Sequence, residues 1–268
     1  MPKSWSFVDI VIIMKLGFIG TGKITSSVIT GICSSKISYK EILISPRNKS
    51  VANSLSKKFQ KVIIAKNNQE IVNNCNWIFL SVTPIVGKKI IKELVFKSNQ
   101  TIISFISTIT LAQLKKVIKV KAKIVRAIPL PPISLKKGPI PICPPNKSVK
   151  DFFNKIGTTV EIKNEKSSIN FWVTSGMMAV FYELLRVMTD WLVKRGVRRD
   201  NAQKYITSLF LALSEDAVVN SKKNLKYLVK ESQTPKGLNE QGVKELTKAG
   251  FYKSLEKTLN SIHRRLNR

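Results

Sequence analysis

The chain has 268 residues, a hydrophobic content of 43% and a formal net charge of +30, from 46 Lys and Arg against 16 Asp and Glu. This hydrophobic content can fill the cores of two modest domains, so the composition excludes a chain that is disordered overall. A basic excess usually indicates nucleic acid or an anionic membrane as the partner. Most of the basic residues are Lys, and Asn and Ile are also abundant, so a biased composition explains the charge equally well.

Cysteine and histidine usage limits the possible chemistry. The three cysteines (Cys33, Cys75 and Cys143) lie far apart, and the single histidine, His263, lies near the C-terminus. We therefore expect no disulfide framework, no metal site and no His-dependent catalytic triad. The apolar run in residues 1–13 is too short for a signal peptide, so we predict a cytoplasmic protein in which these residues form an N-terminal extension.

Short runs rich in Ile and Val alternate with amphipathic stretches from Lys15 to Ile162. We predict strands over residues 15–20, 41–46, 62–65, 77–82, 101–107, 123–129, 139–143 and 158–162, with helices over 23–34, 48–59, 85–96 and 110–118. Most of these runs lack polar alternation, which is typical of strands buried on both faces. The pattern predicts an α/β fold, with a doubly wound parallel sheet of the Rossmann type in residues 14–165.

Strand signals end after residue 165. We predict helices over 169–194, 200–219, 221–232 and 239–262, which together form a smaller all-α domain of residues 166–268. The first helix is apolar on most sides, but Glu183, Arg186 and Asp190 lie in its interior and argue against a membrane span. Because so wide an apolar face is usually buried, we expect this domain to form a homodimer or a higher homo-oligomer.

A glycine-rich turn, Gly20-Thr21-Gly22, follows the first predicted strand and opens the first helix. The turn reads G-x-G-x-x-T, where the dinucleotide-binding fingerprint has Gly or Ala at the last position. Gly20 permits the tight turn, and Gly22 allows backbone amides to approach a pyrophosphate at the positive end of the helix. The motif therefore predicts a dinucleotide site.

The end of the second predicted strand indicates which dinucleotide binds. NAD sites usually place a carboxylate there for the ribose 2′-hydroxyl. This chain has Ser45, Arg47, Asn48 and Lys49 instead, and Arg can bind a 2′-phosphate with two parallel hydrogen bonds. We therefore predict NADP(H) as the cofactor. The alternative remains open that Arg47 and Lys49 are two more exposed basic residues of a Lys-rich chain.

Six motifs resemble, in order and spacing, those of the pyrroline-5-carboxylate reductases. They are KLGFIGTGKIT at 15–25, LSVTP at 80–84, SFISTITLAQL at 104–114, RAIPLPP at 126–132, SGMMAVFYELL at 175–185 and TPKGLNEQG at 234–242. The resemblance implies a Rossmann domain followed by a helical dimerisation domain. It also implies reduction of the cyclic imine 1-pyrroline-5-carboxylate to proline, in a site between the cofactor and the partner's helical domain.

The resemblance further implies which residues contact the cofactor. It assigns Gly20, Thr21, Gly22, Lys23 and Ile24 to the pyrophosphate, Ser45, Arg47 and Asn48 to the 2′-phosphate, and Val82, Thr83, Pro84, Ile106, Ser107, Ala127 and Pro129 to the nicotinamide end.

The motifs depart from the family pattern where the substrate should lie. The family's RAMPNTP reads RAIPLPP here, and its SPGGTT reads TPKGLN. We take Thr234, Lys236 and Asn239 as the catalytic candidates, with Lys236 pairing with a substrate carboxylate and Asn239 hydrogen-bonding the imine nitrogen. The alternative is that Lys236 is solvated and that Asn239 caps a helix beginning at Glu240.

Three functions are compatible with these residues. The first is NADPH-dependent reduction of 1-pyrroline-5-carboxylate, and the second is the same hydride transfer to another imino or keto acid. The third is a non-catalytic NADP(H)-binding protein. Aromatic residues are not interleaved with the Lys clusters, so we expect a small-molecule substrate and neither a specific nucleic-acid partner nor a membrane partner.

Overall fold

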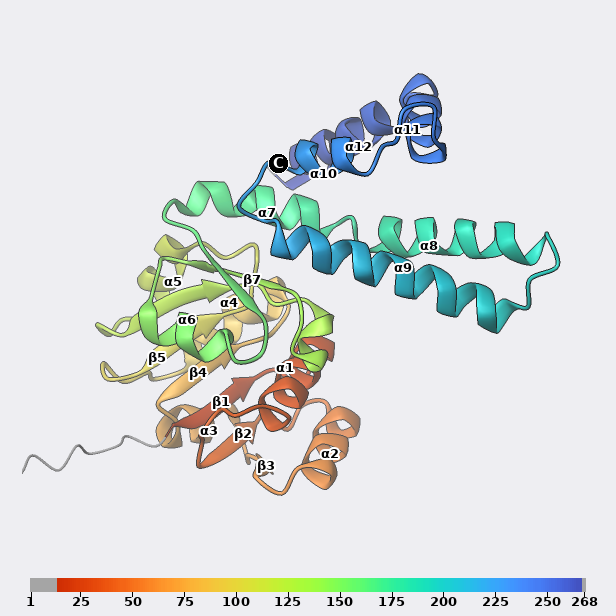
Figure 1. The fold of residues 1–268 in the computed structure, drawn as a ribbon. Helices are drawn as coiled ribbons and strands as arrows, with labels where there is room; N and C mark the ends of the chain where they lie inside the picture. The colour runs from red at the N-terminus through yellow and green to blue at the C-terminus, as the bar shows by residue number, and fades with distance from the viewer. Residues whose placement is uncertain (1–13, 267–268) are drawn as a thin grey trace, which may run out of the picture. The chain divides into compact units, whose positions relative to one another are not determined.

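The computed structural model describes residues 14–266, so the predicted N-terminal extension lies outside the described residues (Figure 1). The chain divides into two compact units between Ser168 and Ile169. The first unit alternates strands with helices, and in the second the described elements are helices. The predicted fold class, a Rossmann-type sheet followed by a helical domain, is confirmed.

Within the described residues, the first unit holds an eight-stranded sheet in the order β3-β2-β1-β4-β5-β6-β7-β8. The strands are β1 (Lys15–Ile19), β2 (Glu41–Ile44), β3 (Val62–Ile64), β4 (Trp77–Leu80), β5 (Thr101–Ser104), β6 (Lys123–Ala127), β7 (Pro139–Cys143) and β8 (Thr158–Glu161). The connecting elements are α1 (Lys23–Cys33), α2 (Lys49–Lys58), α3 (Asn68–Asn74), α4 (Pro84–Glu93), α5 (Leu111–Val117), α6 (Lys147–Phe153) and the short 3-10 helices η1 (Pro131–Leu135) and η2 (Glu165–Ser167).

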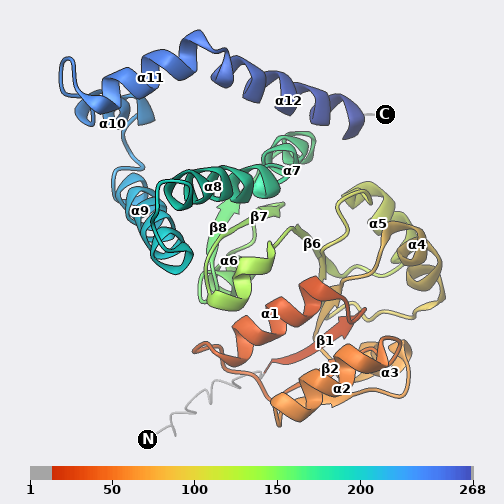
Figure 2. The same ribbon diagram turned by 90° about the vertical axis from the view of Figure 1, so that its right-hand side faces the viewer.

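Helices cover both faces of this sheet (Figure 2). One core lies against α1, α2 and α6, and the other against α3, α4 and α5. Successive residues of β4 alternate between them: Phe79 joins the first core, whereas Ile78 and Leu80 join the second. Both faces are apolar, which explains why the strand sequences lack polar alternation.

Aromatic rings gather in the first of these cores. Phe18 stacks on Phe79 with their ring centroids 4.4 Å apart, and Trp77 lies 4.9 Å from Phe152. The second core consists mainly of Ile, Leu and Val side chains. Both faces are therefore packed mainly by aliphatic side chains, and the first face adds a cluster of aromatic rings.

Two strands, β7 and β8, depart from the predicted parallel arrangement because they run opposite to β1–β6. β7 pairs with β6 in the antiparallel sense, with Arg126 opposite Cys143, while the other pairs are parallel. A parallel pairing requires a crossover connection of about a dozen residues or more. The connection here, residues 128–138, holds only the one-turn η1, so the chain returns beside β6 in the opposite direction.

Two predicted helices of the second unit are each divided in two. Residues 169–194 form α7 (Ser168–Ser175) and α8 (Met178–Val193), and residues 239–262 form α11 (Leu238–Lys248) and α12 (Phe251–Leu266). The second break lies at Gly250, which has a φ of 78°. A glycine in this left-handed conformation is a common way to end a helix, and here it ends α11. In the sequence, α9 (Arg199–Val219) and α10 (Leu225–Glu231) follow α8 and precede α11.

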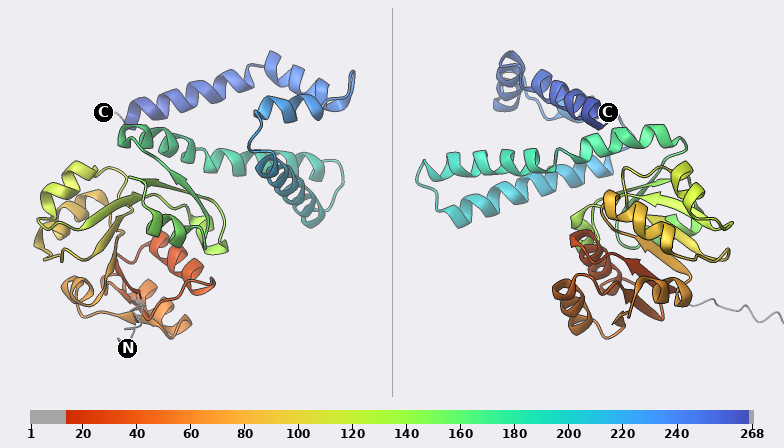
Figure 3. Two further views of the ribbon diagram at one scale, coloured as in Figure 1. Left: turned by 60° about the vertical axis from the view of Figure 1, so that its left-hand side comes forward. Right: turned by 180° about the vertical axis from the view of Figure 1, so that it is seen from behind.

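The helices α8 and α9 pack side by side as an antiparallel hairpin (Figure 3). Phe181 meets Phe210 edge to face at 6.0 Å, and Asp190 pairs with Arg199 at 2.9 Å. Both helices leave large apolar side chains exposed in this single chain, among them Tyr182, Trp191 and Leu211. No helix within residues 14–266 is long and apolar enough to cross a membrane.

The cysteines are free thiols. Burial raises the pKa of Cys75 to about 12, and the same desolvation raises the pKa of Cys33 and Cys143. These thiols therefore stay protonated at neutral pH. The described residues contain no cluster of His, Cys, Asp and Glu suited to a metal ion.

Candidate functional site

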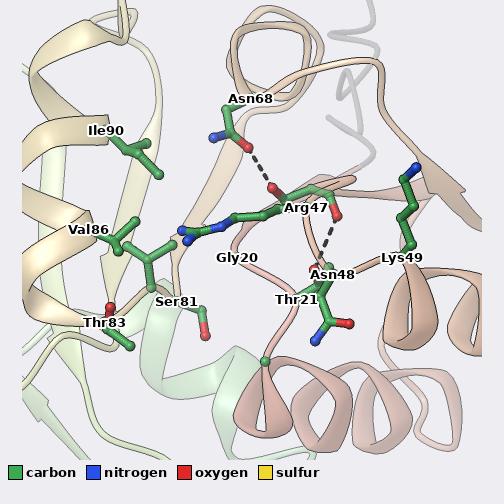
Figure 4. A pocket seen from close by; sticks show the side chains of 13 residues that line it. Gly20, Thr21, Arg47, Asn48, Lys49, Asn68, Ser81, Thr83, Val86 and Ile90 are labelled. Carbon is green, nitrogen blue, oxygen red and sulfur yellow. Dashed lines mark hydrogen bonds between the residues drawn. The ribbon is translucent and has the colours of Figure 1, made fainter.

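A pocket of about 660 Å³ lies at the carboxyl ends of β1, β2 and β4 (Figure 4). The strand order reverses between β1 and β4, and this position is where doubly wound sheets bind dinucleotides. The residues that line the pocket are Gly20, Thr21, Gly22, Ser45, Arg47, Asn48, Lys49, Asn68, Ser81, Val82, Thr83, Val86 and Ile90.

The glycine turn after β1 is fixed by close packing against β4. Gly20 has a φ of 104°, and a Cβ built on it would lie 2.2 Å from the backbone oxygen of Ser81. The buried Thr25 hydroxyl donates to the Gly20 carbonyl at 2.8 Å and lies 2.8 Å from the Ser81 hydroxyl. Thr25 therefore has a structural role at the last fingerprint position, where most Rossmann turns have Gly or Ala.

Gly22 leaves the N-terminus of α1 open toward the pocket. A Cβ on Gly22 would meet no atom within 4 Å. Among residues 14–266 no side chain caps α1, and its first turn carries no acidic residue. The first backbone N–H groups of this helix can therefore bind an anion such as a pyrophosphate.

Ser45 and Arg47 stand at the end of β2. Ser45 is buried, donates its hydroxyl proton to Asn68 Oδ1 at 2.7 Å and accepts at its carbonyl from the Thr21 hydroxyl at 3.2 Å. Figure 4 shows the Arg47 guanidinium reaching across the pocket toward Val86. Because no carboxylate lines the pocket, Arg47 leaves it with a net positive charge.

Asn48 and Lys49 begin the neighbouring helix α2. Asn48 Oδ1 accepts from the backbone N–H of Val51, so this side chain caps the helix. The Lys49 side chain points away from the Arg47 guanidinium (Figure 4). Both basic residues line the pocket, and Arg47 is the one whose charged group reaches across it toward Val86.

Four pocket residues were not among the predicted ones: Asn68, Ser81, Val86 and Ile90. Asn68 begins α3, a short polar helix that the sequence pattern did not predict. Asn67 caps this helix by accepting from Glu70 N, and Asn followed three residues later by Glu is a recognisable helix start. Val86 and Ile90 are spaced four residues apart and therefore share one face of α4.

Other predicted cofactor residues lie outside the lining of the pocket. Lys23 and Ile24 form the first turn of α1, Pro84 begins α4, and Ser107 follows β5. Ala127 ends β6 without exposed surface, so its side chain supports the sheet from within the core. Pro129 follows in the connection to η1.

The predicted substrate residues form a tight turn between α10 and α11 in the second unit. Gly237 N donates to the Thr234 carbonyl at 2.8 Å, and Lys236 has a φ of 63°. Lys236 N donates to Glu240 Oε2 at 2.6 Å. Hydrogen bonds from Lys244 and from this backbone N–H hold the pKa of Glu240 below its usual value.

Asn239 is held within this turn, where its amide Nδ2 donates to the Ser232 carbonyl at 2.7 Å. Helix α11 begins at Leu238 with Gly237 as its N-cap, so the interpretation of Asn239 as the cap is wrong. The preceding Gly237 adopts extended backbone geometry, which places the start of the helix two residues earlier than the sequence suggested. Leu238 stands 86% exposed at this helix start.

Two family models match different parts of the chain. Residues 15–108 match the model described as "NADP oxidoreductase coenzyme F420-dependent", and residues 167–268 match "Pyrroline-5-carboxylate reductase dimerisation". Pyrroline-5-carboxylate reductase 3 of Xenopus laevis is 23% identical over 89% of each chain. The Pseudomonas aeruginosa pyrroline-5-carboxylate reductase is 24% identical over 94% of this chain and 95% of its own.

The chain is therefore similar to pyrroline-5-carboxylate reductases over most of its length. The predicted resemblance to this family and the predicted class, an NADP-dependent oxidoreductase, are confirmed. The same fold occurs in the 1-pyrroline-5-carboxylate reductase of Streptococcus pyogenes, with a TM-score of 0.79, 22% identity and coverage of 94% and 98% of the two chains. It also occurs in the Plasmodium falciparum pyrroline carboxylate reductase with NADP bound, with a TM-score of 0.80, 23% identity and coverage of 94% and 97%.

Proposed function

We propose that the protein reduces 1-pyrroline-5-carboxylate to proline with NADPH. The observation that carries the proposal is the positively charged pocket at the β1–β4 reversal, in a chain whose residues 167–268 match the pyrroline-5-carboxylate reductase dimerisation model. In this reaction a hydride joins the imine carbon and a proton joins the ring nitrogen, so the C=N bond becomes a single bond. NADPH supplies the hydride when it is bound, and the protein must orient the two reactants.

The proposed contacts of the cofactor's phosphates rest on the geometry of the pocket. The open amides at Gly22 and the first turn of α1, including Lys23 and Ile24, suit the pyrophosphate. Arg47 suits the 2′-phosphate, because a guanidinium offers two parallel donors to a phosphate. Ser45 and Asn48 complete this end of the pocket.

We place the nicotinamide beside residues that follow β4, β5 and β6. These are Val82, Thr83, Pro84, Ile106, Ser107 and Pro129. The single histidine lies in α12, and reduction of a cyclic imine does not require a side-chain acid, since the nitrogen is basic enough to arrive protonated or to take a proton from water. Positioning and water exclusion are therefore the main tasks of this part of the protein.

The turn at residues 234–239 is our proposed substrate loop, with Lys236 and Thr234 facing the substrate carboxylate. Its sequence favours a second candidate function on the same fold, the reduction of another imino or keto acid. The exposed Leu238 stands where the family motif has a Thr, and it offers an apolar contact in place of a hydroxyl. A substrate with an apolar group near its carboxylate would suit this loop.

The test is an assay of the purified protein for loss of reduced-nicotinamide absorbance. We expect turnover of 1-pyrroline-5-carboxylate with NADPH, and slower turnover with NADH. A panel of cyclic imino acids and 2-keto acids is assayed in parallel. If the protein reduces another panel member and not 1-pyrroline-5-carboxylate, the second candidate function is supported. NADPH binding without turnover of any substrate would contradict both candidate functions.

Asn239→Ala is expected to raise the KM for the substrate about fivefold while kcat stays nearly unchanged. The reason is that the Asn239 amide donor is already bound to the Ser232 carbonyl, so the side chain holds the loop in shape. Steady-state kinetics measure both constants. Asn220→Ala is the matched control, because Asn220 makes a similar bond to the Asp216 carbonyl at the end of α9. A loss of kcat of about 100-fold would instead place Asn239 on the imine nitrogen, as the sequence suggested.

We also propose that the second unit forms a homo-oligomer, supported by its match to a dimerisation model and by the exposed apolar side chains of α8 and α9. The free thiols of Cys33, Cys75 and Cys143 support the cytoplasm as the compartment.

A further inference from the structure

A buried arginine at the end of β6 binds two separate parts of the chain. Arg126 is 3% exposed, and its guanidinium donates through Nη1 to Glu165 Oε1 and through Nη2 to the backbone carbonyl of Ser107. Glu165 Oε1 also accepts from the backbone N–H of Leu111 at 2.8 Å. One ion pair thus connects β6, η2 and the segment that follows β5.

These contacts hold the middle and the C-terminal boundary of one loop, residues 105–110, which joins β5 to α5. Ser107 lies within the loop, and Leu111 is the first residue of the helix that follows. Glu165 adds a negative charge at the N-terminus of α5, which favours the helix start. Inside the loop, Ile106 and Ile109 are buried. The polar pair therefore fixes the backbone of a segment whose side chains already belong to the core.

The loop also belongs to the same packed cluster as the wall of the cofactor pocket, since Val82 packs against the core that contains Ile106. A Cβ built on Gly87 in α4 would lie 2.9 Å from Ile106 Cδ1 and 3.2 Å from Val82 Cγ2. Val82 is one of the residues that line the pocket. A shift of the loop would therefore displace the packing between Ile106 and the end of β4, where the pocket begins.

Stability alone is a weak explanation for this ion pair. Taking a guanidinium and a carboxylate out of water has a large desolvation cost, and apolar residues of similar size often stabilise a core equally well. An apolar pair, however, has no means of holding a carbonyl and an amide at fixed positions. The planar guanidinium can hold the Ser107 carbonyl and the Glu165 carboxylate at fixed positions, because its N–H donors point in fixed directions.

We propose that Arg126 and Glu165 are positioning residues, which fix loop 105–110 so that Ile106 and Ser107 hold the nicotinamide end of the cofactor in the geometry for hydride transfer. This proposal rests on the proposed function, in which this loop flanks the nicotinamide. Hydride transfer is sensitive to displacements of about 1 Å, so loss of the pair should lower the rate of the chemical step more than it weakens binding.

The test compares Arg126→Lys and Glu165→Gln with the wild-type protein. Lys keeps the positive charge and the buried aliphatic chain, but it lacks the planar guanidinium that donates to two acceptors at once. Gln keeps an acceptor oxygen and removes the negative charge. We expect Arg126→Lys to lower kcat about tenfold and Glu165→Gln to lower it less. The Kd of 2′,5′-ADP, which carries only the adenosine and 2′-phosphate end, should change by less than about twofold. Gln has nearly the same size and shape as Glu, so the Glu165→Gln variant can still be tested if the Arg126→Lys variant does not fold.

The matched control is the pair Lys150–Glu161, which joins α6 to β8 at 2.6 Å in the same unit. Lys150→Gln and Glu161→Gln should leave kcat unchanged. If Arg126→Lys and Glu165→Gln lower only the thermal midpoint, with wild-type kcat per folded molecule, the pair is merely structural and the proposal is overturned.

Hydrogen exchange separates this proposal from the proposed function. The backbone amides of residues 106–111 should exchange faster in Arg126→Lys than in the wild type or in Lys150→Gln. If the wild-type protein reduces no substrate, the proposed function fails, and the exchange data still decide whether the pair fixes the loop. Unchanged exchange in these amides would contradict the positioning role whatever the activity.

Discussion

Gly20→Ala is expected to lower the thermal midpoint of the first unit by about 10 °C, corresponding to a loss of about 4 kcal/mol. Two effects add. A φ of 104° is strained for any residue with a Cβ, and the new methyl carbon would lie 2.2 Å from the Ser81 carbonyl oxygen. That oxygen belongs to the backbone after the central strand β4, so it has little freedom to move away. Circular dichroism during heating measures the midpoint.

Gly22→Ala is the matched control for this substitution. Gly22 has a φ of −88°, and a Cβ there would meet no atom within 4 Å, so the midpoint should change by less than about 2 °C. The methyl group would, however, project over the amides proposed for the pyrophosphate, and the Kd of NADPH should rise about tenfold. If both variants lost stability equally, the close contact between Gly20 and Ser81 would not be what fixes the turn.

Arg47→Glu is expected to raise the Kd of NADPH about 100-fold, the loss of roughly 2.7 kcal/mol of binding free energy. The new carboxylate would repel the 2′-phosphate and would accept a hydrogen bond from the 2′-hydroxyl of NADH. The Kd of NADH should therefore stay the same or fall. Titrations that follow the fluorescence of each reduced cofactor measure the two constants.

Lys49→Glu gives the same change in net charge two residues further along the chain. Because the Lys49 side chain points away from the Arg47 guanidinium, we expect its effect on the Kd of NADPH to stay below about fivefold. Equal effects of the two substitutions, or parallel changes for NADH and NADPH, would show that the overall positive charge of the protein attracts the cofactor. In that case Arg47 would have no specific role in selecting NADPH.

The sequence predicted the sheet well because both of its faces are apolar. Runs such as the one from Trp77 to Leu80 are buried throughout, and a continuous apolar run is how such strands appear in a sequence. The direction of β7 was not predictable in the same way. It depends on the length and shape of the connection through η1, which carries no periodic signal.

The candidate site was predicted where a local motif determines the geometry. The turn at Gly20 and the polar residues from Ser45 to Asn48 follow directly from the pattern of strand, turn and helix. Asn68 was missed because its contact with Ser45 joins residues 23 positions apart, through a helix too short and polar to be recognised. The sequence shows Thr25 only as a departure from the fingerprint, and its role follows from the hydroxyl that donates to the Gly20 carbonyl.

The unequal packing of the two sheet faces has a consequence for how this chain and its relatives diverge. Exchanges among Ile, Leu and Val preserve volume closely, so the core against α3, α4 and α5 can accumulate neutral substitutions one at a time. Stacked rings such as Phe18 and Phe79 depend on one another's shape and orientation, so replacements there must be coordinated. The face covered by α1 and α6 should therefore change more slowly over evolution than the opposite face.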